Sequence, residues 1–140
     1  MKKSIILSTF ICLVTLCSIQ AQETNSLTVT VSNIKTQKGT IMIGLYKGEN
    51  TFLEKAFKTK KTSANSSSVT LTFDNIPAGE YGISLYQDKD NNGKLNTNFI
   101  GIPSEPYAFS NNAKGMFGPA KWEDVKFSVT DKETIQNIKL

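Results

Sequence analysis

The chain has 140 residues, of which 16 are Lys or Arg and 12 are Asp or Glu, for a formal net charge of +4. Every basic side chain is a lysine, because the sequence contains neither arginine nor histidine. Specific nucleic-acid recognition relies on arginine, so this composition argues against a nucleic-acid partner. The lack of histidine excludes Ser-His-Asp and Cys-His catalysis and zinc sites that use histidine.

Residues 1–21 are predicted to be a secretory signal peptide. Lys2 and Lys3 precede an apolar stretch over residues 5–16, and Ala21 is a small residue at the expected cleavage point. The apolar stretch is shorter than the ~20 residues that a membrane-spanning helix needs, so we expect no membrane span. The protein is therefore expected to be exported, to the periplasm, the cell surface or the medium. Residues 22–140 are expected to form a single domain.

The cysteine count supports one structural expectation for that domain. Cys12 and Cys17 both lie within the predicted signal peptide, so the mature part contains no cysteine. An exported domain without a disulfide must be held by its core alone, or by its core together with a metal ion.

The mature sequence is expected to form short strands separated by turns. Apolar residues alternate with polar ones, the pattern of a half-buried strand, in five segments: 27–31, 41–45, 69–73, 81–85 and 125–129. The first two segments are predicted to pair as a hairpin across the turn at 37–39. With the closing segment 135–140, the pattern predicts an all-β fold, a single antiparallel β-sandwich of about seven strands.

Two segments between the first strands lack this alternation. Residues 51–58 place apolar side chains at helical spacing and predict one short helix. Residues 58–68 are rich in lysine and serine, and this composition predicts a solvated linker.

Residues 88–96 follow a predicted strand and resemble the first half of an EF-hand-type calcium loop. Asp88, Asp90 and Asn92 occupy its first, third and fifth positions, and Gly93 occupies the sixth, where the loop must turn. The backbone carbonyl of Lys94 and the side chain of Asn96 follow at the next ligand positions. These five ligand residues predict a calcium site, and calcium is the one cofactor that the sequence indicates.

The twelfth position of this loop departs from the pattern. It holds Phe99, where a bidentate glutamate belongs, so another segment must supply the missing carboxylate. Glu105 and Asp124 are the candidates. The alternative is a metal-free loop in which Asp and Asn side chains accept hydrogen bonds from the backbone of the loop itself.

Residues 99–123 are predicted to be a long loop rich in glycine, proline and aromatic residues. Loops of this length in a compact domain are usually functional or packed on themselves. Tyr107, Phe109 and Trp122 are candidate ligand contacts, with a glycan or a cell-envelope protein as the partner. The alternative is that these aromatic side chains plug one end of the sandwich.

The order of these segments resembles a known family. The segments that carry the resemblance are residues 76–81, 88–96, 101–113, 118–119 and 123–127. They are similar to the secreted bacterial proteins of domain-of-unknown-function family 2141, which implies an exported β-domain without an assigned activity. The turn at 77–81 also resembles that of transthyretin-like (prealbumin-like) sandwich modules, a resemblance that bears on an Ig-like or transthyretin-like fold and not on function.

Three classes of function remain open. The first is a non-catalytic binding or interaction module, stabilised by calcium. The second is a purely structural or accessory domain. The third is a hydrolase that uses paired carboxylates on a glycan, for which five acidic residues are available: Asp88, Asp90, Glu105, Glu123 and Asp124.

Overall fold

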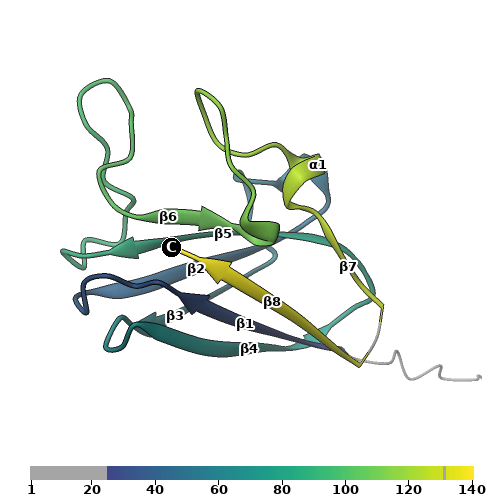
Figure 1. Ribbon diagram of the computed structural model, residues 1–140. Coiled ribbons are helices and arrows are strands. Elements are labelled where there is room, and N and C mark those ends of the chain that lie inside the picture. The colour runs from purple at the N-terminus through teal and green to yellow at the C-terminus, as the bar shows by residue number, and fades with distance from the viewer. Residues whose placement is uncertain (1–24, 131) are drawn as a thin grey trace, which may run out of the picture.

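The computed structural model describes residues 25–130 and 132–140, so the predicted signal peptide lies outside the described part (Figure 1). The described elements are, in chain order, β1 (Asn25–Ser32), β2 (Thr40–Lys47), η1 (Glu49–Thr51), β3 (Lys58–Ser63), β4 (Ser68–Ile76), β5 (Gly79–Asp88), β6 (Tyr107–Phe109), η2 (Ser110–Asn112), α1 (Trp122–Val125), β7 (Phe127–Val129) and β8 (Glu133–Lys139). None of the helices in the described part is long and apolar enough to cross a membrane.

The strands form two sheets. The smaller sheet has the order β4-β1-β8, and the larger has the order β3-β2-β5-β6, with β7 pairing with β5 beyond the end of β6. The predicted all-β sandwich is confirmed, and Figure 1 shows the two layers. One pairing differs from the antiparallel prediction, because β8 runs parallel to β1.

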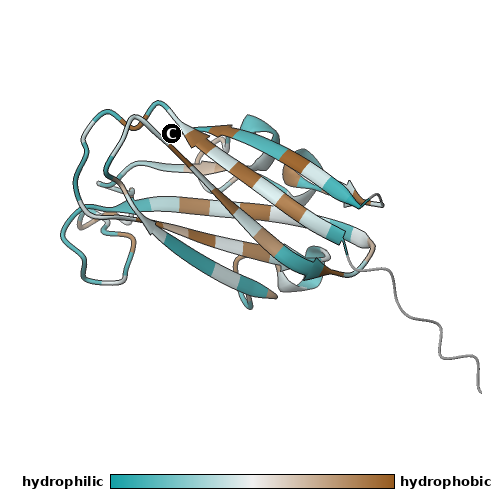
Figure 2. Ribbon diagram, turned by 90° about the horizontal axis from the view of Figure 1, so that it is seen from below, coloured by the Kyte–Doolittle hydropathy of each residue, from teal (hydrophilic) through white to brown (hydrophobic). Residues whose placement is uncertain are grey.

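The core lies between the two sheets and is built from the alternating residues of each strand. Leu27, Val29 and Val31 of β1 face Ile41, Ile43 and Leu45 of β2, and all six side chains are buried. Figure 2 shows the same alternation as bands of apolar and polar residues along the strands. Burial of each such side chain contributes roughly 1.5–3 kcal/mol, so this interface supplies most of the driving force for folding.

The predicted hairpin between the first two strands is wrong. β1 pairs with β4 and β8, whereas β2 lies in the other sheet between β3 and β5. The connection turns at Asn33, which has a φ of 63°, and buries Ile34 in the core as the chain crosses between sheets. Alternation identifies the buried face of a strand but not the strand beside it, because neighbours in either sheet satisfy the same pattern.

The predicted linker over residues 58–68 is also wrong in its first half. Residues Lys58–Ser63 form β3, which pairs with β2 at the edge of the larger sheet. The ammonium group of Lys58 donates to the carbonyl of Asp74 at 2.6 Å, and that of Lys60 donates to the carbonyl of Thr72. A strand without apolar side chains is stable here because its backbone pairs with β2, and its lysines discourage further strand pairing at the open edge.

The short helix is not where the sequence placed it. Within residues 51–58 the helical part is the end of the 3-10 turn η1, and Leu53 has a φ of 61°. The α-helical turn is α1, which includes Val125, a residue predicted to lie in a strand. The predicted long loop contains β6 and η2 as well.

A second apolar cluster covers the outer face of the larger sheet. Phe109, Ala120, Trp122 and Val125 form it, and Phe52 packs against them. It rests on Gly82 of β5, where an added Cβ would lie 2.8 Å from the Trp122 ring. In Figure 1, α1 accordingly lies on the opposite side of this sheet from β1, β4 and β8.

The η2 turn closes one side of the sandwich. Asn111 and Asn112 have φ values of 58° and 54°, a left-handed geometry that asparagine tolerates and that turns the chain here. The side chain of Asn112 also pairs with the edge of β8, because it accepts from the Lys139 amide at 2.8 Å and donates to the Asn137 carbonyl at 3.2 Å. η2 thereby links β6 of the larger sheet to the edge of the smaller one.

Candidate functional site

The candidate site begins where β5 ends. Asp88 is the last residue of β5, and its side chain is 2% exposed. The preceding Gln87 side chain is buried as well and donates to the carbonyls of Thr36 and Lys38 at 2.6 and 2.7 Å. Gly39 touches the Asp88 backbone so closely that an added Cβ would lie 2.0 Å from the Asp88 carbonyl oxygen. The start of the site is therefore held by the β1–β2 connection.

The loop turns around the Asp88 carboxylate. Its Oδ1 accepts from the Asn92 amide at 3.1 Å, and its Oδ2 accepts from the Gly93 amide at 2.8 Å. Asn91 and Gly93 take left-handed conformations, with φ values of 57° and 79°, which Asn and Gly adopt at low cost. The Asp–Asn–Gly spacing predicted from the sequence thus produces a tight turn with backbone amides directed at one carboxylate.

The side chains of Asp90, Asn92 and Asn96 converge. The side-chain Nδ2 of Asn96 donates to Asp90 Oδ2 at 2.8 Å. Asn92 Nδ2 donates to the same Asp90 oxygen at 3.1 Å and to Asn96 Oδ1 at 2.6 Å. The hydrogen bond from Asn96, followed by smaller contributions from Asn92 and Asp88, lowers the pKa of Asp90 below its ordinary value. Lys94 enters through its backbone, whose amide donates to Asn92 Oδ1 at 2.8 Å.

Glu105 completes the group. It is 7% exposed, and its two carboxylate oxygens accept from the amides of Lys89 at 2.8 Å and Asn96 at 3.0 Å. One oxygen atom from each of Asp88, Asp90 and Glu105 lies within 4.8 Å of the other two. Asp124, the other candidate for the missing carboxylate, lies in α1 and is not part of this group.

The three carboxylates concentrate negative charge in a small volume. The ion pairs in residues 25–130 and 132–140 join Lys126 to Glu80 and Glu123, and no ammonium group lies within 4.0 Å of the three carboxylates. The Tyr86 hydroxyl donates to the Gly93 carbonyl at 3.1 Å beside the group. Burial raises the pKa of Tyr86, and the charges of Asp88 and Glu105 raise it further.

Such an arrangement has two possible chemical uses. Buried carboxylates need compensation by hydrogen bonds or by a cation, and backbone amides supply part of it here. Clustered carboxylate and amide oxygens are also the ligands that Ca²⁺ prefers, since it takes 6–8 oxygens at about 2.3–2.6 Å. The same geometry therefore suits a self-contained loop and a calcium site.

The predicted ligand contacts separate into buried and accessible residues. Phe109 and Trp122 are 4% and 6% exposed and belong to the second apolar cluster, so they pack the domain. Tyr107 is partly exposed, lies edge-on to Phe109 with 5.9 Å between ring centroids, and lines a shallow cavity of about 200 Å³ with Lys114 and Gly115. A second shallow cavity, of about 390 Å³, lies between the β1–β2 connection and Pro106.

Five strongly exposed apolar side chains lie on two loops and were not among the predicted contacts. They are Phe99, Ile100, Ile102, Met116 and Phe117. The sequence shows these residues among glycines, prolines and asparagines, but that context does not distinguish an exposed aromatic side chain from a buried one.

The β-sandwich with an acidic loop at the end of β5 defines a small all-β domain. The model of the family described as "Uncharacterized protein conserved in bacteria (DUF2141)" matches residues 29–137, and the chain belongs to this family. No curated protein and no solved structure matches the chain. The resemblance to transthyretin-like modules is not confirmed.

Proposed function

We propose that this protein is an exported, non-catalytic interaction module in which a calcium ion fixes the base of a contact loop. The observation that carries the proposal is the convergence of Asp88, Asp90 and Glu105, whose oxygens lie within 4.8 Å of one another and which form no ion pair with a lysine in the described part of the chain. Two of these carboxylates are buried, so the repulsion between them is poorly screened by water. A divalent cation compensates this charge more fully than backbone amides do.

The ligand set for the ion combines the predicted loop residues with Glu105. The three carboxylates supply charge, Asn92 and Asn96 supply neutral side-chain oxygens, and the Lys94 carbonyl supplies a backbone oxygen. A carboxylate oxygen has two lone pairs, so Asp88 and Glu105 can keep their backbone hydrogen bonds while they bind an ion. Glu105 thus supplies the carboxylate that an EF-hand loop would have at the position of Phe99.

The ion would stabilise a segment that has no disulfide to hold it. Residues 88–96 and Glu105 flank an excursion of the chain between β5 and β6. An ion bound by both ends would tie the excursion closed and stabilise the folded state by mass action. The mature domain has no cysteine for this purpose.

This excursion, the loop of residues 97–104, is also the reason to propose an interaction role. Its base adjoins the carboxylate group, since the Ser104 amide donates to the Asn96 carbonyl at 2.8 Å and Thr97 pairs with Pro103. Its tip displays Phe99, Ile100 and Ile102 to solvent. Exposed apolar side chains on a loop are typical of contact surfaces, and a metal at the base would hold this one in place.

A purely structural domain is the second candidate. The observation in its favour is that the Asp88 carboxylate accepts from the Asn92 and Gly93 amides, as in a loop that needs no ion. A glycan hydrolase is the third. It has less support, because Asp88 and Glu105 are buried against backbone amides and the two cavities described above are lined by other residues.

Calorimetric titration of the chelator-treated protein with calcium chloride tests the proposal. We expect saturable binding at one site, lost in Asp88→Asn and kept in Asp124→Asn, which removes an exposed acid outside the group. The absence of binding heat, together with an unchanged melting temperature in millimolar calcium and in excess chelator, would favour the structural domain. Hydrolysis of a glycan that is lost in Asp90→Asn would instead favour the enzyme.

A further inference from the structure

Two loops of the larger sheet end in exposed apolar side chains. We call Phe99, Ile100 and Ile102 the first tip, and Met116 and Phe117 the second tip. Phe99 is 98% exposed, Met116 86% and Phe117 108%, so these side chains have almost no contact with the domain. Figure 1 shows that both loops project beyond β6 on the side away from β1, β4 and β8.

The first tip is a closed turn whose backbone is hydrogen-bonded internally. Asn98 Oδ1 accepts from the amides of Ile100 and Ile102 at 3.1 and 2.9 Å. The Asn98 carbonyl accepts from Gly101 at 3.0 Å, and the Asn98 amide donates to the Ile102 carbonyl at 2.8 Å. The amides of three consecutive residues at the tip therefore do not depend on water for a partner.

The second tip is a tight turn between two glycines. A Cβ on Gly115 would lie 1.8 Å from the carbonyl oxygen of Gly118, so the chain can close there only without a side chain. Phe117 has a φ of 59°, which is costly for a bulky residue. The turn places Met116 and Phe117 in solvent, whereas the neighbouring Ala120 and Trp122 are buried.

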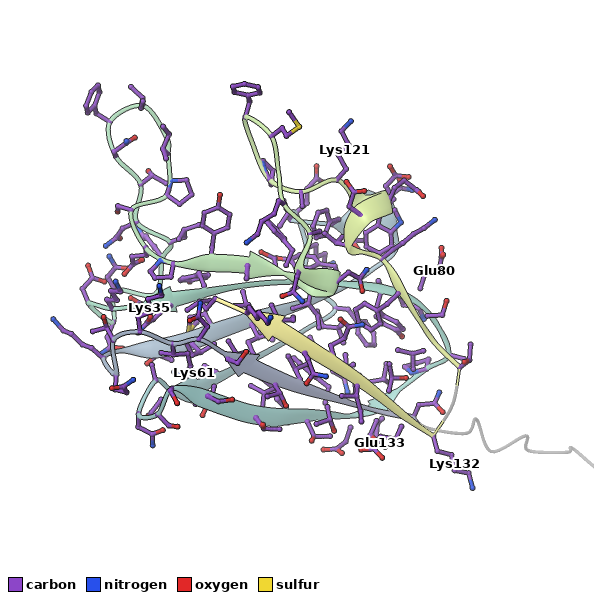
Figure 3. All side chains as sticks on the ribbon, in the orientation of Figure 1. Lys35, Lys61, Glu80, Lys121, Lys132 and Glu133 are labelled. Atoms are coloured by element: carbon purple, nitrogen blue, oxygen red, sulfur yellow. The ribbon has the colours of Figure 1, made fainter. Side chains whose placement is uncertain are left out.

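The exposed charged side chains of the segment that carries both tips are lysines. Residues 97–121 contain three charged side chains, Glu105, Lys114 and Lys121. Glu105 is buried and bonded to backbone amides, whereas both lysines are exposed. Lys121 lies on the side from which the tips project (Figure 3). A surface that approaches the second tip therefore meets Met116 and Phe117, with Lys114 and Lys121 close to them in the sequence.

We propose that the two tips bind the surface of a lipid bilayer that contains anionic phospholipids. The apolar side chains would enter the interface between headgroups and acyl chains, and Lys114 and Lys121 would contact anionic headgroups. This inference rests on the interaction role proposed above but not on the calcium ion.

The shape of the tips favours a bilayer over a protein or a glycan. They are two separate convex projections, so a protein partner would need a matching pocket for each, whereas a bilayer accepts both without shape complementarity. The internal hydrogen bonds of the first tip also suit an environment that is poor in water, where an unpaired amide is costly. Glycan binding commonly uses exposed aromatic faces at a concave site, whereas Phe99 and Phe117 are not among the residues that line the shallow cavity beside Tyr107.

Vesicle flotation with the purified protein in excess chelator tests the inference. The chelator removes calcium that could bridge acidic side chains to lipid. We expect binding to vesicles that contain phosphatidylglycerol and much weaker binding to vesicles of phosphatidylcholine alone. The double variant Phe99→Ser/Phe117→Ser should bind the anionic vesicles at least tenfold more weakly, on the order of 1.4 kcal/mol or more. The melting temperature should not change, because neither side chain packs on the core.

The matched control is Ile135→Ser, which removes an exposed apolar side chain from β8 in the other sheet and should leave vesicle binding unchanged. Lys114→Gln/Lys121→Gln should reduce the preference for anionic vesicles. The inference is overturned if the protein floats with neither vesicle, if the serine variant binds as well as the wild type, or if the tips bind only an envelope protein. Calcium binding measured without vesicles reports separately on the proposed function.

Discussion

Replacement of Glu105 by glutamine separates a calcium site from a self-contained loop. The two Glu105 oxygens accept from the Lys89 and Asn96 amides at 2.8 and 3.0 Å. Glutamine keeps one oxygen and puts an NH₂ group against the other amide, so one buried donor loses its acceptor. This loss lowers the free energy of unfolding by about 1–3 kcal/mol whether or not a metal is present.

Bound calcium adds a second difference in the free energy of unfolding between the wild type and Glu105→Gln. An ion at one hundred times its dissociation constant stabilises the folded wild type by about 2.7 kcal/mol, and a variant without a charged ligand loses most of that gain. Glu105→Gln should therefore be destabilised by about 1–3 kcal/mol in chelator and by roughly 4–6 kcal/mol in saturating calcium.

Urea unfolding in both conditions measures the two differences. Glu54→Gln is the matched control, because Glu54 is exposed and distant in sequence from the carboxylate group, and its effect should be small and equal in both conditions. If Glu105→Gln loses the same free energy in chelator as in calcium, Glu105 does not bind the ion and the reasoning fails.

Three further predictions follow from the same structure, each checked by urea unfolding followed through the fluorescence of the single tryptophan. Gly39→Ala should cost about 1–3 kcal/mol more than Gly48→Ala, because both glycines have positive φ values but only the Gly39 Cβ would meet backbone atoms; equal losses would contradict this. Ser110→Ala should cost about 1–3 kcal/mol, because its buried hydroxyl accepts from the Ile83 amide and donates to the Val125 carbonyl, and an unchanged midpoint would argue against these bonds. The pKa of Asp90 is below its ordinary value of 3.8, so ionised Asp90 stabilises the folded state above pH 3.8. This stability is lost as the pH falls through the lower pKa of the folded state. Asp90→Asn should therefore lose less stability in acid than the wild type, and an identical dependence of stability on pH in the two proteins would contradict this prediction.

Much of the fold could be predicted because burial in a sandwich repeats every two residues. Leu27, Val29 and Val31 identify one inward face, and the same holds for the predicted strands over residues 41–45, 69–73 and 81–85. The pairing of strands could not be predicted in this way, since β1 would satisfy its pattern in either sheet. β3 was missed because its sequence contains no apolar residue and its stability comes from backbone pairing with β2.

The candidate site was predictable in part for a related reason. The spacing of Asp88, Asp90 and Gly93 is local, and local spacing determines how a tight loop turns. Glu105 lies beyond the loop and reaches Asp88 and Asp90 only because of the path that the chain takes between β5 and β6. The sequence does not show this path, so it does not distinguish Glu105 from Asp124. The exposure of Phe99 and the burial of Phe109 were likewise not predictable, because both depend on which side chains pack over the larger sheet.

Diffraction from crystals grown with calcium tests the central claim most directly. We predict a metal peak bound by oxygens of Asp88, Asp90 and Glu105 at about 2.3–2.6 Å, with Asn92 or Asn96 among the remaining ligands. A map at saturating calcium without such a peak, in which Asp88 and Glu105 bind only the backbone amides they contact here, would contradict the calcium site.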